Sequence, residues 1–311
     1  MQREWPVRSD RRRFLQGLAG LGAALALRPV HAGCEPRRTR PIPGSDAAIP
    51  VIGMGTWLTF GIDPGNESAL AQRTAVLRTL LEAGGGMVDS SPMYGTSEQV
   101  IGRCLQRIGH HRGLFGATKV WTTTARQGYV QMEHSKALWG LPRLDLMQVH
   151  NLLDWKTHLP NLFAMKARGE IRYVGVTTSH GRRHQELIGI MQRAPLDFVQ
   201  FTYNVLDREA EQTLLPLARD RGMAVIVNRP FRRGALFEHI GNAPLPGWAS
   251  EIECDNWAQV LLKFIVSHPA VTCAIPATRR VDHLRENLGA GCGTLPDAAL
   301  RRRIAEHVAG L

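Results

Sequence analysis

Hydrophobic and polar positions follow a repeating pattern from residue 51 toward the C-terminus. Short apolar runs, of the length of buried strands, are separated by longer stretches in which apolar residues recur with helical spacing. The stretch 68–83 is typical, because apolar residues such as Leu70, Leu77 and Leu80 share one helical face and glycines 84–86 follow, where a helix can end. The eight apolar runs predicted to be strands are 51–56, 87–90, 114–119, 144–150, 172–177, 198–203, 224–228 and 271–276.

Strands that alternate with helices predict a parallel sheet. Eight such units in a chain of 311 residues predict an α/β fold of the (β/α)8 TIM barrel type, over residues 49–311. A doubly wound sheet has the same order of elements and is the alternative. Its phosphate-binding loop requires Gly-x-Gly-x-x-Gly, whereas residues 53–58 (GMGTWL) place Leu58 at the third glycine position. The pattern therefore favours the barrel.

The first 32 residues have the organisation of an export signal. They carry six arginines and two acidic residues, which is +4 of the chain's net charge of +11. Residues 10–16 (DRRRFLQ) resemble the twin-arginine (Tat) signal, in which paired arginines precede a variable residue and Phe-Leu. A weakly apolar run over 17–27 and small residues near position 32 follow, and this run is shorter than the ~20 residues of a membrane span.

We therefore predict a signal peptide over 1–32, a Pro/Arg-rich linker over 33–48, and a periplasmic or otherwise exported protein carried by the Tat machinery. Lipid anchoring at Cys34 is the alternative. It is disfavoured because His31 stands where a lipoprotein signal has a branched apolar residue. No stable membrane span is expected.

Charge and cysteine content limit the function classes. The net charge of +7 beyond residue 32 favours an anionic ligand such as a dinucleotide. The arginines are not interleaved with aromatic residues, so no nucleic-acid groove is predicted. Five widely spaced cysteines predict buried free thiols rather than a disulfide framework. No Cys/His run has zinc-ligand spacing, so no metal site is expected and a metal-dependent barrel hydrolase is disfavoured.

Ionisable residues stand at the ends of three predicted strands, where a barrel gathers its functional side chains. Asp89 ends the second strand, Lys119 the third and His150 the fourth, and Tyr94 lies in the loop after Asp89. The Lys119 ammonium would lower the tyrosine pKa from ~10, and Asp89 would hold Lys119 charged. Tyr94 would then be a general acid toward a carbonyl oxygen, or a general base toward an alcohol. His150 would orient the substrate oxygen through a hydrogen bond.

Residues 89–98 (Asp-Ser-Ser-Pro-Met-Tyr-Gly-Thr-Ser-Glu) resemble the signature of the aldo-keto reductase family, Asp-Thr-Ala-x-x-Tyr-Gly followed by Ser-Glu. Lys119 after Ala-Thr and His150 after Val resemble the lysine and histidine strands of that family. The resemblance extends over residues 49–290. It implies an oxidoreductase that reduces an aldehyde or ketone, or oxidises the alcohol, with Asp89, Tyr94, Lys119 and His150 as catalytic residues.

The resemblance also implies NADP(H) extended across the barrel mouth, with NAD as an alternative. The residues implied to hold its nicotinamide end are Thr56, Trp57, Thr177, Thr178, Gln200 and Asn228. Those implied at the pyrophosphate are Pro230, Phe231, Arg232, Arg233, Gly234 and Leu236, and those at the adenosine end are Thr278, Arg279, Arg280, Glu286 and Asn287.

The sequence departs from the family pattern at the cofactor. Asn228 stands where many members have an aromatic residue stacked on the nicotinamide, and Thr178 replaces an asparagine. Ala277 and His283 stand where some members bind the 2′-phosphate with Lys and Arg, a role for which Arg279 or Arg280 would substitute. The alternative function is an exported NADP-binding barrel that acts as a redox sensor or partner protein with little turnover. The candidates for an apolar substrate pocket are Trp57, Trp121, Trp155 and Phe231.

Overall fold

Eight parallel strands form the central sheet of the computed structural model, which describes residues 37–311. The predicted Tat signal and Cys34 lie outside the described residues. The strands are β3 Met54–Gly55, β4 Gly86–Asp89, β5 Leu114–Val120, β6 Leu144–Val149, β7 Ile171–Thr177, β8 Phe198–Thr202, β9 Ala224–Asn228 and β10 Cys273–Ala274. Each strand pairs with its neighbour in the chain, and bridges from Ile52 to Ala274 and from Gly55 to Ala277 join the first strand to the last. The predicted TIM barrel is therefore confirmed.

The two strands at the closing seam are shorter than predicted. At this seam the Gly53 amide donates to the Ala274 carbonyl at 2.9 Å, and the Gly55 amide donates to the Pro276 carbonyl at 3.1 Å. Pro276 has no N–H to return, so the paired ladder cannot continue through it. A Cβ atom at Gly53 would lie 2.8 Å from the Met87 carbonyl oxygen, and one at Gly55 would lie 2.9 Å from that of Ile275. Gly55 therefore permits close approach of the strands at the seam, and Gly53 permits close approach of the first strand to β4.

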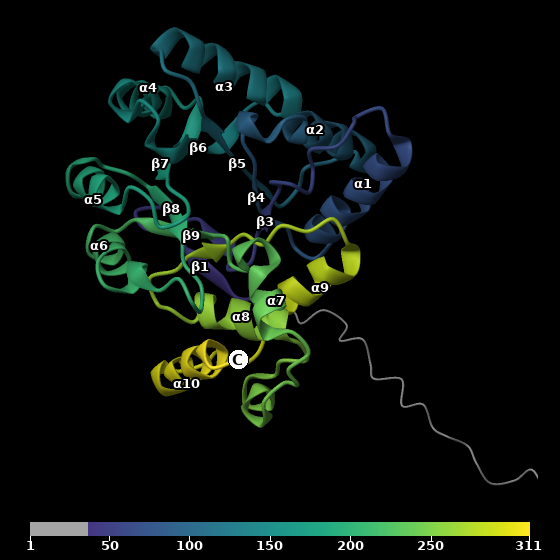
Figure 1. Cartoon of the computed structure of the whole chain (residues 1–311). Helices are drawn as coiled ribbons and strands as arrows, with labels where there is room; N and C mark the ends of the chain where they lie inside the picture. Colours follow the sequence, from purple (N-terminus) through teal and green to yellow (C-terminus); the bar gives the residue numbers. More distant parts are fainter. Residues whose placement is uncertain (1–36) are drawn as a thin grey trace, which may run out of the picture. The chain divides into compact units, whose positions relative to one another are not determined.

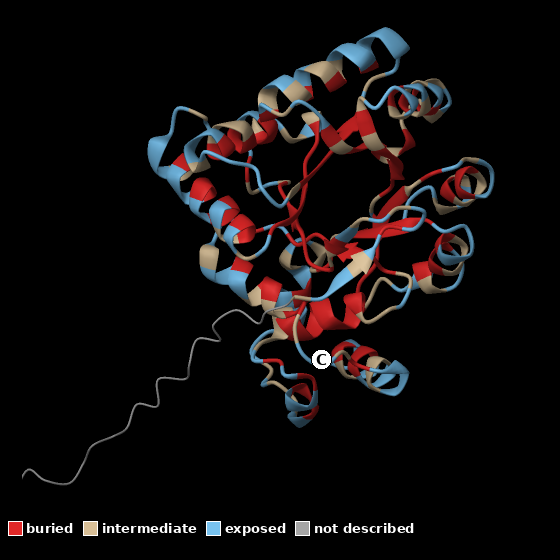
Figure 2. Ribbon diagram, turned by 180° about the vertical axis from the view of Figure 1, so that it is seen from behind, coloured by how far each residue is buried: buried red, intermediate tan, exposed pale blue. Residues whose placement is uncertain are grey.

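Helices surround the strands in a ring (Figure 1). The predicted helix over 68–83 is α1, Glu67–Glu82, and the backbone after it has positive φ at all three glycines 84–86. The helices are α1 Glu67–Glu82, α2 Ser97–Ile108, α3 Ala125–Trp139, α4 Trp155–Ala167, α5 His184–Arg193, α6 Leu214–Asp220, α7 Ala235–Ile240, α8 Trp257–Val266, α9 Val281–Gly289 and α10 Ala298–Ala309. Buried positions face the strands and exposed positions lie on the outer helix surfaces (Figure 2).

A short antiparallel hairpin, β1 (Thr39–Pro41) and β2 (Ala48–Pro50), closes the N-terminal end of the barrel. Its buried Ile42 and Ile49 pack with residues from the first halves of the barrel strands, including Phe115. The Ser45 hydroxyl lies 2.8 Å from that of Tyr173 on β7. The described part of the predicted linker over 33–48 is therefore part of the folded domain, because its Ile42, together with Ile49 just beyond it, completes an apolar layer.

The cysteines follow the prediction in part. Cys104, Cys254 and Cys273 are free and buried, as expected. Cys292 is disulfide-bonded, so the expectation of free thiols is wrong at this position. Within residues 37–311, no three His, Cys, Asp or Glu side chains are grouped so as to hold a metal ion. Over the same residues, every helix is too short or too polar to cross a membrane.

Candidate active site

The C-terminal ends of three neighbouring strands bring the four predicted catalytic residues together. Asp89 ends β4, Lys119 is the penultimate residue of β5, and His150 directly follows β6. Tyr94 ends the short 3-10 helix η1 (Pro92–Tyr94), which follows β4 closely in the chain. Asp89, Tyr94 and His150 line a cavity of about 1030 Å³, and Lys119 is fully buried against Asp89.

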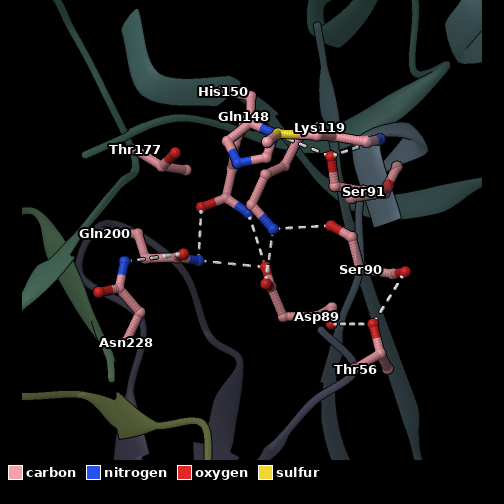
Figure 3. A network of polar contacts seen from close by, with 12 residues as sticks. Thr56, Asp89, Ser90, Ser91, Lys119, Gln148, His150, Thr177, Gln200 and Asn228 are labelled. Carbon is pink, nitrogen blue, oxygen red and sulfur yellow. Dashed lines mark hydrogen bonds and ion pairs between the residues drawn. The ribbon is translucent and has the colours of Figure 1, made fainter. Parts of the chain in front are cut away.

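Asp89 and Lys119 form a buried ion pair, and both side chains make further hydrogen bonds to neighbouring groups. Lys119 Nζ donates to Asp89 Oδ1 at 2.6 Å and to the Ser90 carbonyl at 2.7 Å (Figure 3). The other carboxylate oxygen accepts from the side-chain amides of Gln148, at 3.0 Å, and Gln200, at 3.1 Å. Burial lowers the pKa of Lys119, but Asp89 and Tyr94 raise it by more, so this pKa lies above its usual value. Lys119 is therefore a charged ammonium inside the barrel.

Tyr94 lies against this ammonium, with its ring centroid 5.1 Å from Lys119 Nζ. Burial raises the pKa of the phenol, Lys119 lowers it through its charge and a hydrogen bond, and Asp89 raises it again. The net direction is upward, so the predicted lowering by Lys119 is present but is outweighed by desolvation. Tyr94 therefore carries its proton at neutral pH, which is the form that a general acid requires.

His150 is neutral and held beside Tyr94. Burial and the nearby charge of Lys119 lower its pKa to about 3. Its ring meets the Tyr94 ring edge-on, with centroids 5.7 Å apart and planes at 84°. Its Nδ1 atom is 2.8 Å from the Ser91 hydroxyl oxygen. A neutral imidazole in this position can donate a hydrogen bond into the cavity without adding charge.

Most residues predicted to hold a cofactor line this cavity. Those in its wall are Trp57, Thr177, Thr178, Gln200, Asn228, Pro230, Phe231, Arg233, Gly234, Thr278, Glu286 and Asn287. Among them, the Thr178 hydroxyl is buried and has no hydrogen-bond partner within residues 37–311. A buried hydroxyl without a partner is costly, so it indicates a position where a ligand supplies the bond.

Five residues predicted to hold the cofactor lie outside the cavity wall. They are Thr56, Arg232, Leu236, Arg279 and Arg280. Thr56 Oγ1 lies 2.9 Å from the Asp89 carbonyl oxygen and 2.9 Å from Ser90 Oγ, and so supports the strand that carries Asp89. Arg232 pairs with Asp207 at 3.1 Å, and Leu236 is fully buried.

Asn228 occupies its strand end as a polar bridge. Its Nδ2 donates to the Thr178 carbonyl at 2.9 Å and to Gln200 Oε1 at 3.2 Å, and its Oδ1 accepts from Thr202 at 2.7 Å. The Gln200 amide is consequently bonded at both ends, because its nitrogen also donates to Asp89 and to Gln148. A side chain that bridges three neighbouring strands in this way replaces the aromatic residue of the family pattern.

The structure adds residues that the sequence analysis missed. Gln148 lies two positions before His150, and a glutamine within an apolar strand was the available signal. Other wall residues that were missed are Met93, His180, Arg182, Arg183 and Trp257. Met93 is at a variable position of the signature over 89–98, and Trp257 begins α8. His180, Arg182 and Arg183 lie between β7 and α5, where the sequence carries no motif that would have identified them. Of the predicted substrate-pocket aromatics, Trp57 and Phe231 line the cavity, whereas Trp121 and Trp155 do not.

Known proteins are similar to this chain in sequence and in fold. The sequence model of the aldo/keto reductase family matches residues 51–304. The NADH-specific methylglyoxal reductase of Escherichia coli is 26% identical over 67% of this chain and 72% of its own. The Schizosaccharomyces pombe aldo-keto reductase yakc [NADP(+)] is 25% identical over 83% of this chain and 88% of its own.

A solved structure shares the fold. The aldo/keto reductase of Klebsiella pneumoniae in complex with NADP and acetate superposes with a TM-score of 0.71 at 22% identity. The match covers 86% of this chain and 94% of that one. At 22% identity, this similarity shows that the two proteins share the barrel fold.

Proposed function

Because the chain belongs to the aldo/keto reductase family, we propose that it is an NADP(H)-dependent oxidoreductase that reduces an aldehyde or ketone and catalyses the reverse oxidation of the alcohol. The observation that carries this proposal is the protonated phenol of Tyr94 against the buried Asp89–Lys119 ion pair. This arrangement places a proton donor at the wall of a cavity large enough for a substrate and a dinucleotide.

Each side chain has a separate task in the proposed reaction. The nicotinamide, when bound, supplies a hydride to the carbonyl carbon. Tyr94 gives its proton to the carbonyl oxygen, and Lys119 stabilises the phenolate that forms. Asp89 keeps Lys119 charged and fixed. His150 donates a hydrogen bond to the same oxygen and so orients the carbonyl.

The cavity wall supports a nicotinamide dinucleotide as the cofactor. The unpartnered Thr178 hydroxyl lies where the carboxamide of the nicotinamide is expected. Arg182, Arg229 and Arg233 line the same wall, and none of them has a carboxylate within ion-pair distance among the described residues. These cations favour the more anionic nucleotide, which supports NADP(H) over NAD(H). The relatives' names include both an NADH-specific and an NADP(+) enzyme, so the assay compares the two nucleotides directly.

The proposal is tested with Tyr94→Phe. Oxidation of NADPH and of NADH is followed with a panel of aldehydes and ketones, and nucleotide affinity is measured by fluorescence. Loss of general acid catalysis should lower kcat by about 100-fold or more, while the nucleotide Kd stays near the wild-type value. Tyr129→Phe, at an exposed position on α3, is the matched control and should keep full activity.

Wild-type turnover in Tyr94→Phe would contradict the proposed acid. A wild-type protein that binds nucleotide but reduces no carbonyl compound would favour the redox-sensor alternative. Preference for NADH over NADPH would overturn the choice of cofactor alone.

A further inference from the structure

The hydroxyl of Ser91 connects the turn that carries Tyr94 to the ring of His150. Ser91 is fully buried, and its backbone is extended, with φ of −164° and ψ of 147°. It caps η1, because its Oγ accepts a hydrogen bond from the Met93 amide at 3.2 Å. The same oxygen lies 2.8 Å from His150 Nδ1 (Figure 3). The short turn thus holds the hydroxyl at a fixed place beside the imidazole.

Counting donors and acceptors fixes the direction of the hydrogen bond between Ser91 and His150. A hydroxyl has one proton to give, and a neutral imidazole has one N–H and one acceptor nitrogen. The Met93 amide already supplies a proton to Ser91 Oγ, so the hydroxyl proton remains to be placed. Within residues 37–311, His150 Nδ1 is the only side-chain or backbone acceptor that Ser91 Oγ meets. If Nδ1 carried the proton instead, the buried hydroxyl proton would have no acceptor.

The imidazole ring of His150 is neutral and carries a single proton. His150 is buried beside the Lys119 ammonium, so a doubly protonated imidazolium is disfavoured at neutral pH. With Nδ1 as an acceptor, the single ring proton must be on Nε2. His150 belongs to the cavity wall, and Nε2 makes no hydrogen bond to the described residues. An Nε2–H group is therefore available to a ligand in the cavity.

We propose that Ser91 is a positioning residue that selects the Nε2–H tautomer of His150, so that this ring donates to the substrate oxygen rather than accepting from it. The inference rests on the proposed reductase function. The opposite tautomer would present a lone pair to the carbonyl oxygen and repel it. Ser91 stands where the signature quoted above, Asp-Thr-Ala-x-x-Tyr-Gly, has alanine, so the hydroxyl is not one of the residues that carry the resemblance.

The test combines a spectroscopic readout with kinetics. Nitrogen-15 NMR of histidine-labelled full-length protein distinguishes a protonated from an unprotonated ring nitrogen, and the signals of His150 are assigned by their loss in His150→Gln. We expect the wild type to show His150 with Nε2 protonated and Nδ1 bare. Ser91→Ala should show a mixture of the two tautomers or a change to Nδ1–H, and Ser91→Thr, which retains a hydroxyl, should restore the wild-type spectrum.

The value of kcat should depend on which tautomer of His150 is present. Ser91→Ala should lower kcat roughly tenfold, as expected for the loss of one oriented hydrogen bond, with the nucleotide Kd unchanged. Ser91→Thr should recover most of that loss. Ser135→Ala is the control, because it also removes a buried hydroxyl. The Ser135 hydroxyl donates to Glu98 Oε2 at 2.9 Å, and neither residue lines the cavity. This variant should keep the wild-type kcat and the wild-type His150 signals.

Three outcomes would overturn the inference: a wild-type His150 protonated on Nδ1, a Ser91→Ala spectrum identical to that of the wild type, or a changed spectrum with unchanged kcat. The wild-type spectrum decides the tautomer even if Ser91→Ala fails to fold. Recording this spectrum does not require the protein to turn over a substrate. Absence of carbonyl reduction would therefore count against the proposed function and not against the assigned tautomer.

Discussion

At the scale of single residues, burial decides the charge of the side chains around the cavity. His150 has a pKa of about 3 in the folded protein, against an ordinary value of 6.5. Below pH 6.5 the unfolded chain therefore binds a proton that the folded protein excludes. The free energy of unfolding should fall as the pH decreases from 6.5 toward 3, by up to about 1.4 kcal/mol per pH unit from this residue. Above pH 6.5 the residue should contribute no pH dependence.

Urea denaturation between pH 7 and pH 4 measures this effect. His150→Gln should have a less steep loss of stability with falling pH than the wild type, because glutamine does not titrate. His134→Gln, at an exposed position on α3, is the control and should follow the wild-type curve. Parallel curves for the wild type and His150→Gln would show that His150 does not resist protonation in the folded state.

The positions of these residues can be predicted from the sequence, but some of their properties cannot. The periodicity of apolar runs locates the strand ends, so Asp89, Lys119 and His150 can be predicted from the sequence alone. The net direction of the Tyr94 pKa was predicted wrongly, because it depends on how deeply the phenol is buried. The hydroxyl of Ser91 was passed over because its contact with His150 joins residues 59 positions apart.

At the scale of elements, close packing of α2 on α3 depends on one glycine. A Cβ atom at Gly102 would lie 1.8 Å from the Leu138 carbonyl oxygen, which belongs to the backbone of α3 and cannot move by a side-chain rotation. Gly102→Ala should therefore force the two helices apart and destabilise the protein by about 1–3 kcal/mol, although alanine favours a helix over glycine. Urea denaturation at neutral pH gives the change in the free energy of unfolding.

Gly189 on α5 provides the matched control. A Cβ atom there would meet only the end of the flexible Arg193 side chain, at 3.1 Å. Gly189→Ala should therefore leave stability unchanged or raise it by up to about 1 kcal/mol through helix propensity. Equal stabilisation by both alanines would mean that α2 and α3 are not in the close contact described.

Elements with regular periodicity were predicted well, and those stabilised by tertiary contacts were not. The strands β5 to β9 carry apolar runs that are buried on both faces, which single-chain patterns reveal. The hairpin β1–β2 has only three residues in each strand and is rich in Pro and Arg, so it has the composition of a linker. It forms a hairpin because Ile42 and Ile49 fill the open end of the barrel, a requirement that exists only once the barrel has closed.

At the scale of the whole molecule, the predicted Tat signal and the barrel together raise the question of how the protein, if it is exported, would obtain a nicotinamide cofactor. Tat transports folded proteins, so a cofactor bound before export would cross with the protein. We propose that the protein is exported with its nucleotide already bound. The disulfide at Cys292 supports an oxidising destination, because disulfides are typical of such compartments. The wide cavity and its arginines support a tightly held anionic nucleotide.

Fractionation of a Gram-negative host that expresses the full chain tests both parts of this proposal. The wild type should be recovered from the periplasm and should release nucleotide, detected by absorbance and mass spectrometry, when it is denatured. Arg11→Lys combined with Arg12→Lys keeps the charge but removes the arginine pair, so this variant should remain in the cytoplasmic fraction. Arg13→Lys, at the variable position of the signal, is the matched control and should be exported as the wild type is. Retention of the wild type in the cytoplasm would contradict export, and nucleotide-free protein in the periplasm would contradict transport of the loaded barrel.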